Sequence, residues 1–200
     1  MTKESSEMSR RGVEVISDYK SRVARAVSIL DSNAVLGLVD ALQKTRSVGG
    51  VVFVAGNGGS ASTAGHIVVD WMLGTQLSNP PLRVVSISEG TAAITATGND
   101  VDFESIFSRQ FSVLATEQDL LVVISASGNS PNLLRVASDA KVRGIPVCAI
   151  TGFNGGQLRS MADISVHVST EMGDYGVAED AHLMLGHIVK EVLIAEESHA

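Results

Sequence analysis

The sequence has little of several residue types that would define a special class of protein. Its 200 residues include one cysteine, four prolines and 4% aromatic residues. A single cysteine excludes an intramolecular disulfide and a cysteine metal cluster, and Cys148, in the apolar run IPVCAI, is expected to be a small core residue. With so few aromatic side chains, the core must consist mainly of Val, Ile, Leu and Ala.

Long apolar runs and basic tracts are also missing. The longest apolar stretches, such as VVFVA at 51–55, are far shorter than the roughly 20 residues that a transmembrane helix needs. The first twelve residues are polar and unlike a secretory signal, so we expect a cytoplasmic protein with no membrane contact. A formal net charge of −7 without a dense Lys/Arg tract argues against nucleic acid as a partner.

The pattern of apolar residues predicts a parallel sheet covered by helices on both faces. Short apolar runs alternate with helical stretches, which is typical of strands buried on both sides. The five expected strands are 51–56, 83–88, 119–125, 145–151 and 164–169. Two helices are expected over residues 8–47 and a long one over Val177–Glu197. The fold class is an α/β three-layer sandwich, one domain over 1–200, whose helices within 1–48 pack on the domain or on a neighbouring subunit.

The loop after the first expected strand has the features of an anion site. The stretch GNGGS at 56–60 has glycines that allow a sharp turn with exposed amides. Ser60 can cap the next helix or donate to an anion at its positive end. A tight strand-to-helix turn without a ligand is the alternative interpretation.

A second loop, SASGNSPN at 125–132, repeats this arrangement. Ser125, Ser127 and Ser130 converge in one turn before a helix, where hydroxyls and exposed amides suit a phosphate without lysine or arginine. Ser130 followed by proline is also an ordinary helix start. Three serines exceed what capping needs, so we favour the phosphate site.

Four further polar residues stand on helical stretches. His66 and Asp70, four apart, share one face, whereas Glu179 and His187, eight apart, lie about 80° from each other. If the helices meet, this set suits zinc or another divalent metal, and equally a pair that moves protons. The simpler alternatives are a packed histidine and solvated or helix-start carboxylates. His182 is expected to be packed beside the site.

Together these motifs resemble a known family. GNGGSA, SASGNSPN, GND at 98–100 and TGFNGG at 151–156 are similar to the loops of the sugar isomerase (SIS) domain, specifically of the sedoheptulose 7-phosphate isomerase (phosphoheptose isomerase) family. The similarity runs over nearly the full chain and implies a flavodoxin-like sheet. It also implies substrate contacts for several residues in addition to the three serines of the second loop. These are Asn57, Gly58, Ser60, Asn99 and Asp100, although Asn99 and Asp100 could instead form a helix cap.

The resemblance also assigns roles to the helical residues. Family members carry His and Glu four apart after the first loop, and Gln and His eight apart on the last helix; His66, Asp70, Glu179 and His187 match these positions. It implies that Asp70, Glu179 and His187 are catalytic, that all four bind one Zn²⁺ per subunit, and that the protein is a homotetramer. Asp70 and Glu179 depart from the family residues in length or charge.

A further departure is a missing arginine. The family often follows its helical acid with TGR, whereas this sequence reads DWMLGTQL at 70–77. Arg83 and Arg109 are the candidates to replace that arginine.

With these residues in place, the resemblance implies an aldose-ketose isomerase that converts D-sedoheptulose 7-phosphate to D-glycero-D-manno-heptose 7-phosphate by an enediol-type proton transfer, in heptose biosynthesis. Asp70 or Glu179 would be the base. Two alternatives stay open: a non-catalytic SIS protein that binds a sugar phosphate or a replication-initiation partner, and an isomerase of another phosphosugar. His187 together with Asp70 favours an enzyme.

Overall fold

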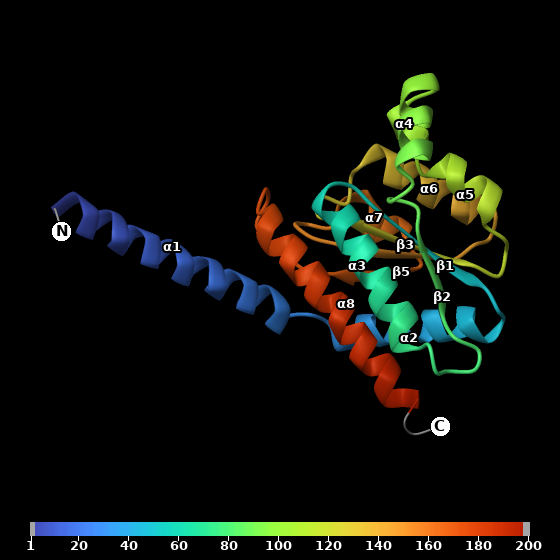
Figure 1. Cartoon of the computed structure of the whole chain (residues 1–200), viewed down its shortest axis with the longest axis horizontal. Helices are drawn as coiled ribbons and strands as arrows, with labels where there is room; N and C mark the ends of the chain where they lie inside the picture. Colours follow the sequence, from blue (N-terminus) through green and yellow to red (C-terminus); the bar gives the residue numbers. More distant parts are fainter. Residues whose placement is uncertain (1–2, 198–200) are drawn as a thin grey trace.

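A five-stranded parallel sheet forms the centre of the molecule (Figure 1). The computed structural model describes residues 3–197. The strands are β1 Val51–Gly56, β2 Arg83–Ser86, β3 Leu120–Ser125, β4 Val147–Thr151 and β5 Ile164–His167. They pair in the order β2-β1-β3-β4-β5, the flavodoxin-like order, which confirms the predicted fold class. In such sheets ligands bind beyond the carboxyl ends of the strands.

Helices cover both faces of this sheet. They are α1 Lys3–Ser28, α2 Ser32–Ser47, α3 Gly59–Gly74, α4 Thr91–Asp100, the 3₁₀ helix η1 Phe103–Ser105, α5 Ser108–Leu114, α6 Pro131–Val142, α7 Gly156–Met161 and α8 Tyr175–Glu197. Helices α2, α3 and α8 pack on one face, and α5, α6 and α7 on the other. Helix α4 projects from the body and buries none of its residues (Figure 1).

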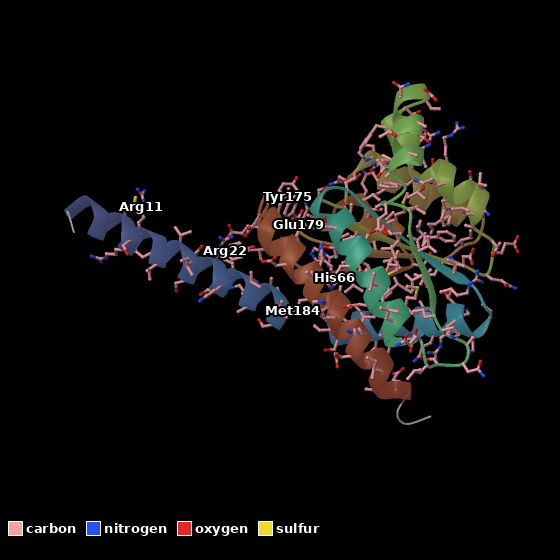
Figure 2. The ribbon with its side chains drawn as sticks, in the orientation of Figure 1. Arg11, Arg22, His66, Tyr175, Glu179 and Met184 are labelled. Carbon is pink, nitrogen blue, oxygen red and sulfur yellow. The ribbon has the colours of Figure 1, made fainter. Side chains whose placement is uncertain are left out.

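Helix α1 extends away from the domain, and of its described residues only those in the C-terminal part of this helix contact the domain (Figure 2). Ala26 packs there against α8, and the Tyr19 hydroxyl donates a hydrogen bond of 2.7 Å to Asp180. This bond to a carboxylate raises the pKa of Tyr19 to about 12. Apolar side chains farther along α1, including Val13 and Ile16, are exposed.

Among residues 3–197, no single helix is long and apolar enough to cross a membrane. One bent pair, residues 8–28 with 32–47, meets the length and composition criteria jointly, with an angle of 66° between its helices.

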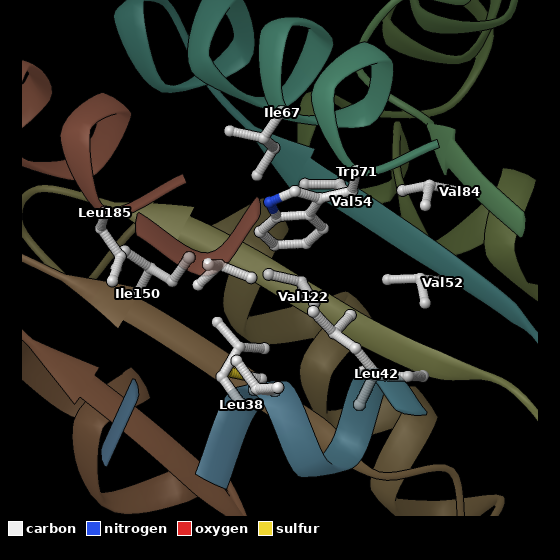
Figure 3. Close-up of a cluster of buried hydrophobic side chains, with 14 of the residues drawn as sticks. Leu38, Leu42, Val52, Val54, Ile67, Trp71, Val84, Val122, Ile150 and Leu185 are labelled. Atoms are coloured by element: carbon white, nitrogen blue, oxygen red, sulfur yellow. The ribbon is translucent and has the colours of Figure 1, made fainter. Parts of the chain in front are cut away.

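The core beneath α3 and α8 is built around Trp71 (Figure 3). Trp71 is fully buried, and its indole nitrogen donates a hydrogen bond of 3.0 Å to the carbonyl oxygen of Gly186 in α8. The two helices approach so closely here that a Cβ at Gly186 would lie 2.2 Å from Ile67 Cγ2. Glycine at 186 therefore sets the spacing between the two helices that carry the candidate site.

The core on the other face of the sheet, under α5, α6 and α7, consists mainly of aliphatic side chains with few aromatic ones, as the composition predicts. Phe53 of β1 and Phe111 of α5 make an edge-to-face pair with ring centroids 5.4 Å apart. Cys148 of β4 belongs to the core around Trp71, where it is fully buried, and burial raises the pKa of its thiol to about 12. The prediction that Cys148 is a core residue is confirmed.

Candidate active site

Helices α3 and α8 bring two histidines and one carboxylate together. The Nε2 atoms of His66 and His187 lie 3.0 Å apart, and Asp70 Oδ2 lies 3.5 Å from the first and 3.4 Å from the second. Each histidine side chain is about half exposed, and Asp70 is 18% exposed. Figure 2 shows His66 where α3 meets α8. The cluster is therefore reachable from outside the protein.

The spacing of these three atoms suits a tetrahedral metal ion. Two nitrogen ligands at zinc–nitrogen distances of 2.0–2.1 Å on a tetrahedral centre lie about 3.3 Å apart. The triangle formed by His66, Asp70 and His187 has sides close to that value. In the described part of the chain they form a three-residue group whose ligand atoms all lie within 4.8 Å of one another. Asp70, although one methylene shorter than glutamate, is in position to bind the same metal ion as both imidazoles.

Glu179 does not join this group. Its carboxylate lies against Gly59, at the start of α3, where an added Cβ would be 2.2 Å from the carboxylate carbon. Glu179 instead lines a cavity of about 110 Å³ together with serines of both glycine-containing loops. Figure 2 shows it beside Tyr175 at the start of α8. The structure thus divides the four predicted ligands into a group of three and one carboxylate in a neighbouring pocket.

The pocket combines two helix N-termini with serine hydroxyls. Its walls are Asn57, Ser60, Ile124, Ser125, Ala126, Ser127, Ser130, Tyr175 and Glu179. Ser60 belongs to the first turn of α3, and Ser130 immediately precedes α6. Exposed amides at such positions favour an anion. The volume corresponds to a few water molecules at about 30 Å³ each, which suits a small group such as a phosphate.

Hydrogen bonds hold the serine loop in shape. Ser125 Oγ accepts from the amide of Gly128 at 3.1 Å, and Ser127 Oγ accepts from the amide of Asn129 at 3.2 Å. Gly128 has a φ of +65°, and a Cβ there would lie 1.9 Å from the carbonyl oxygen of Gly155. In these two bonds the hydroxyls are acceptors, so the hydroxyl hydrogens can still be donated to a ligand.

Several sequence expectations about loop residues change. Gly58, rather than Ser60, occupies the N-cap of α3. Ser130 is at the N-cap of α6, but its side chain makes no capping bond. Asp102, not Asp100, caps the segment that follows, because Asp102 Oδ1 accepts from the amide of Ser105 at 2.7 Å.

The asparagines of the predicted substrate site have different surroundings. Asn57 and Asn132 exchange two hydrogen bonds of 2.9 Å through their amide groups, which ties the first loop to α6. Asn57 also lines the pocket. Asn99 and Asp100 lie exposed at the end of α4 and are bonded to each other at 2.7 Å. They do not line the serine pocket within this chain.

Two residues of the site were not singled out in the sequence. Lys190 Nζ lies 3.4 Å from Asp70 Oδ1, and Tyr175 forms part of the pocket wall. Lys190 follows His187 by three positions, which places both on one helical face, so the spacing could have indicated it. Arg83 donates to the carbonyl oxygen of Gly49 at the opposite end of the sheet, which does not support the suggestion that it replaces the family's arginine.

His182 is a buried histidine beneath the site. It is 1% exposed, and neither ring nitrogen has a hydrogen-bond partner of ordinary geometry among the described residues. Burial lowers the pKa of His182 to about 4, although the nearby Thr151 backbone opposes this shift. The expectation of a packed histidine agrees with this position.

The low pKa of His182 predicts a loss of stability in mild acid. The pKa of histidine in an unfolded chain is near 6.5. Between that pH and about 4, the unfolded state binds a proton that His182 in the folded state does not bind. We expect the free energy of unfolding to fall by about 2 kcal/mol from this group between pH 7.5 and 5. Urea unfolding of wild type and His182→Leu at both pH values measures this. An equal pH dependence in the two proteins would show that His182 is not the cause.

Comparison with known proteins places the chain in a class. The SIS domain model matches residues 17–152, so the chain belongs to the SIS-domain family. A phosphoheptose isomerase from Burkholderia pseudomallei (strain K96243) is 38% identical over 152 residues, 76% of each chain. One from Mycobacterium bovis (strain BCG / Pasteur 1173P2) is 34% identical over 179 residues, 90% of this chain and 89% of that one.

Two solved structures of phosphoheptose isomerases match the fold of this chain. The phosphoheptose isomerase from Neisseria gonorrhoeae matches with a TM-score of 0.82 at 26% identity, covering 94% of this chain and 99% of that one. The one from Francisella tularensis matches with a TM-score of 0.73 at 27% identity, covering 96% and 98%. Within the SIS-domain class, the chain belongs to the phosphoheptose isomerase family.

Proposed function

We propose that the protein is an aldose-ketose isomerase that converts D-sedoheptulose 7-phosphate to D-glycero-D-manno-heptose 7-phosphate. The observation that carries this proposal is that helices α3 and α8 contribute both to the serine pocket at two helix N-termini and to the His66, Asp70 and His187 cluster. The pocket suits the phosphate, and the cluster suits chemistry at the other end of the sugar. The family to which the chain belongs supports the same reaction.

We propose that zinc is bound by His66, Asp70 and His187, where it would polarise the sugar carbonyl. His187 Nε2 cannot both hold a metal and carry a proton. With these donors occupied, Glu179 is the other carboxylate proposed as the base. It lines the serine pocket, so this role requires that the carbon next to the carbonyl lie between that pocket and the metal. In a metal-free protein, Asp70 Oδ2 and His187 Nε2 would move the proton instead. His187 is required in either case.

A homotetramer remains a proposal supported by unpaired surfaces. The outward half of α1 exposes Val13 and Ile16, and α4 buries no residue. In an assembly, Asn99 and Asp100 at the end of α4 would be available to contact the substrate in the active site of another subunit. Light scattering coupled to size-exclusion chromatography should give a molar mass about four times the 20.9 kDa of one chain.

We also propose a cytoplasmic location, where phosphorylated sugars are made and used.

The phosphate assignment can be tested at Ser127. Replacing Ser127 by Asp keeps an oxygen that can accept from the Asn129 amide but adds a negative charge to the pocket. We expect the KM for sedoheptulose 7-phosphate to rise about tenfold or more through like-charge repulsion. Ser127→Asn, which keeps the acceptor without the charge, should change KM by less than about threefold.

Steady-state kinetics on both variants separates charge from shape. Equal changes in KM for Ser127→Asp and Ser127→Asn would contradict a phosphate in this pocket. A matched set of other sugar phosphates, five and six carbons long, distinguishes a heptose isomerase from an isomerase of another phosphosugar.

A further inference from the structure

A lysine ammonium stands directly behind the carboxylate of the three-residue cluster. Lys190 Nζ lies 3.4 Å from Asp70 Oδ1, whereas Asp70 Oδ2 faces His66 and His187. The carboxylate therefore has a cation on one oxygen and the two imidazoles on the other.

The lysine is placed there by packing. Its stem crosses α3 at Gly74, where an added Cβ would lie 3.2 Å from Lys190 Cγ and 3.8 Å from Cε. Glycine at the end of α3 leaves room for the stem, and the Lys190 side chain is only 32% exposed. The ammonium is thus held next to Asp70 rather than free in solvent.

Two effects of this lysine on a bound cation oppose each other. A donor to the outer oxygen orients Asp70, and the loss of such outer partners commonly weakens metal binding. Its positive charge repels a divalent ion and neutralises part of the carboxylate that would bind it. At 3.4 Å the contact is longer than the 2.7–2.9 Å of a strong charge-assisted hydrogen bond, so the orienting effect is weak here. The Coulomb term falls only with the first power of distance and doubles for a divalent ion.

We propose that Lys190 opposes metal binding. The positive charge of Lys190 lowers the affinity of the site formed by His66, Asp70 and His187 for divalent cations. This inference rests on the metal site of the proposed function. The site then holds zinc more weakly than the same three ligands would without Lys190. Metal exchange and sensitivity to chelators are set by this residue, which lies outside the predicted ligand set.

The test is the Zn²⁺ affinity of the purified protein, measured by competition with a chromophoric chelator. Lys190→Met keeps the packed stem and removes the charge, and we expect it to bind Zn²⁺ about tenfold more tightly, or better, than wild type. Lys190→Arg keeps the charge and should stay within about threefold of wild type. Lys141→Met, at a lysine paired with Asp163, makes the same change in net charge elsewhere and should leave the affinity unchanged.

Each other result decides against the proposal. Equal or weaker binding by Lys190→Met would overturn it, as would the absence of Zn²⁺ binding in all four proteins. Tight binding by Lys190→Arg as well would show that the stem, not the charge, matters, and would also overturn it. Turnover of sedoheptulose 7-phosphate is measured separately, so zinc affinities in the expected order without turnover would contradict only the proposed reaction.

Discussion

Replacing His187 by Gln is expected to lower kcat/KM for sedoheptulose 7-phosphate by about 10²- to 10⁴-fold. His187 Nε2 lies 3.0 Å from His66 Nε2 and 3.4 Å from Asp70 Oδ2, so its removal deprives the cluster either of a metal ligand or of a proton carrier. The His187 side chain is about half exposed, and its loss leaves no cavity in the core. Stability should therefore change by less than about 0.5 kcal/mol.

The matched control is another histidine outside the cluster. His167 of β5 is hydrogen-bonded to Thr151 Oγ1 at 3.1 Å and lines neither the cluster nor the serine pocket. Steady-state kinetics on His167→Gln should give a kcat/KM within about threefold of wild type. A His187→Gln protein with wild-type turnover would remove His187 from the mechanism.

Replacing Trp71 by Ala should destabilise the protein by about 3–5 kcal/mol. Trp71 is fully buried between α3 and the sheet, and its indole nitrogen bonds the carbonyl oxygen of Gly186. Truncation leaves a cavity and an unpaired buried carbonyl in the contact that joins α3 to α8. Because Trp71 is the only tryptophan, urea unfolding has to be followed by circular dichroism.

One further variant separates the lost donor from the lost ring, and another serves as a control at the surface. Trp71→Phe keeps most of the ring but loses the donor, so we expect a smaller loss of about 1–3 kcal/mol. Val113→Ala, at a side chain that is 84% exposed, should stay within about 0.5 kcal/mol of wild type. A loss below about 1 kcal/mol for Trp71→Ala would contradict its place at the centre of this core.

The sheet could be predicted from the sequence because each of its strands is an apolar run between polar turns. Residues 51–56 form β1 as predicted, and both boundaries of each of the other four strands lie within two residues of the prediction. The direction of α1 could not be predicted in this way. Its apolar stripe has the period of a buried helix, yet Val13 and Ile16 are exposed, since periodicity says which side is apolar but not what covers it.

The candidate site was predictable where spacing on one helix decides the geometry. His66 and Asp70 share a face at four-residue spacing, and His187 meets them across the contact at Gly186. Glu179 was expected beside them, but about eight residues of helical rise, roughly 12 Å, separate it from His187 along α8. Three-residue spacing places Lys190 on the same helical face as His187, but only the packing of α8 on Gly74 shows that its ammonium lies beside Asp70.

In the proposed reaction, this cluster isomerises a heptose phosphate through an enediol-type proton transfer. The most direct measurement is proton NMR of sedoheptulose 7-phosphate incubated in D₂O with zinc-loaded protein. We predict that the aldose product appears and carries deuterium at C2, because the proton taken beside the carbonyl exchanges with solvent before it is returned. Persistence of the unchanged ketose would contradict the proposed reaction, and an aldose without deuterium at C2 would contradict the solvent-exchanging proton transfer.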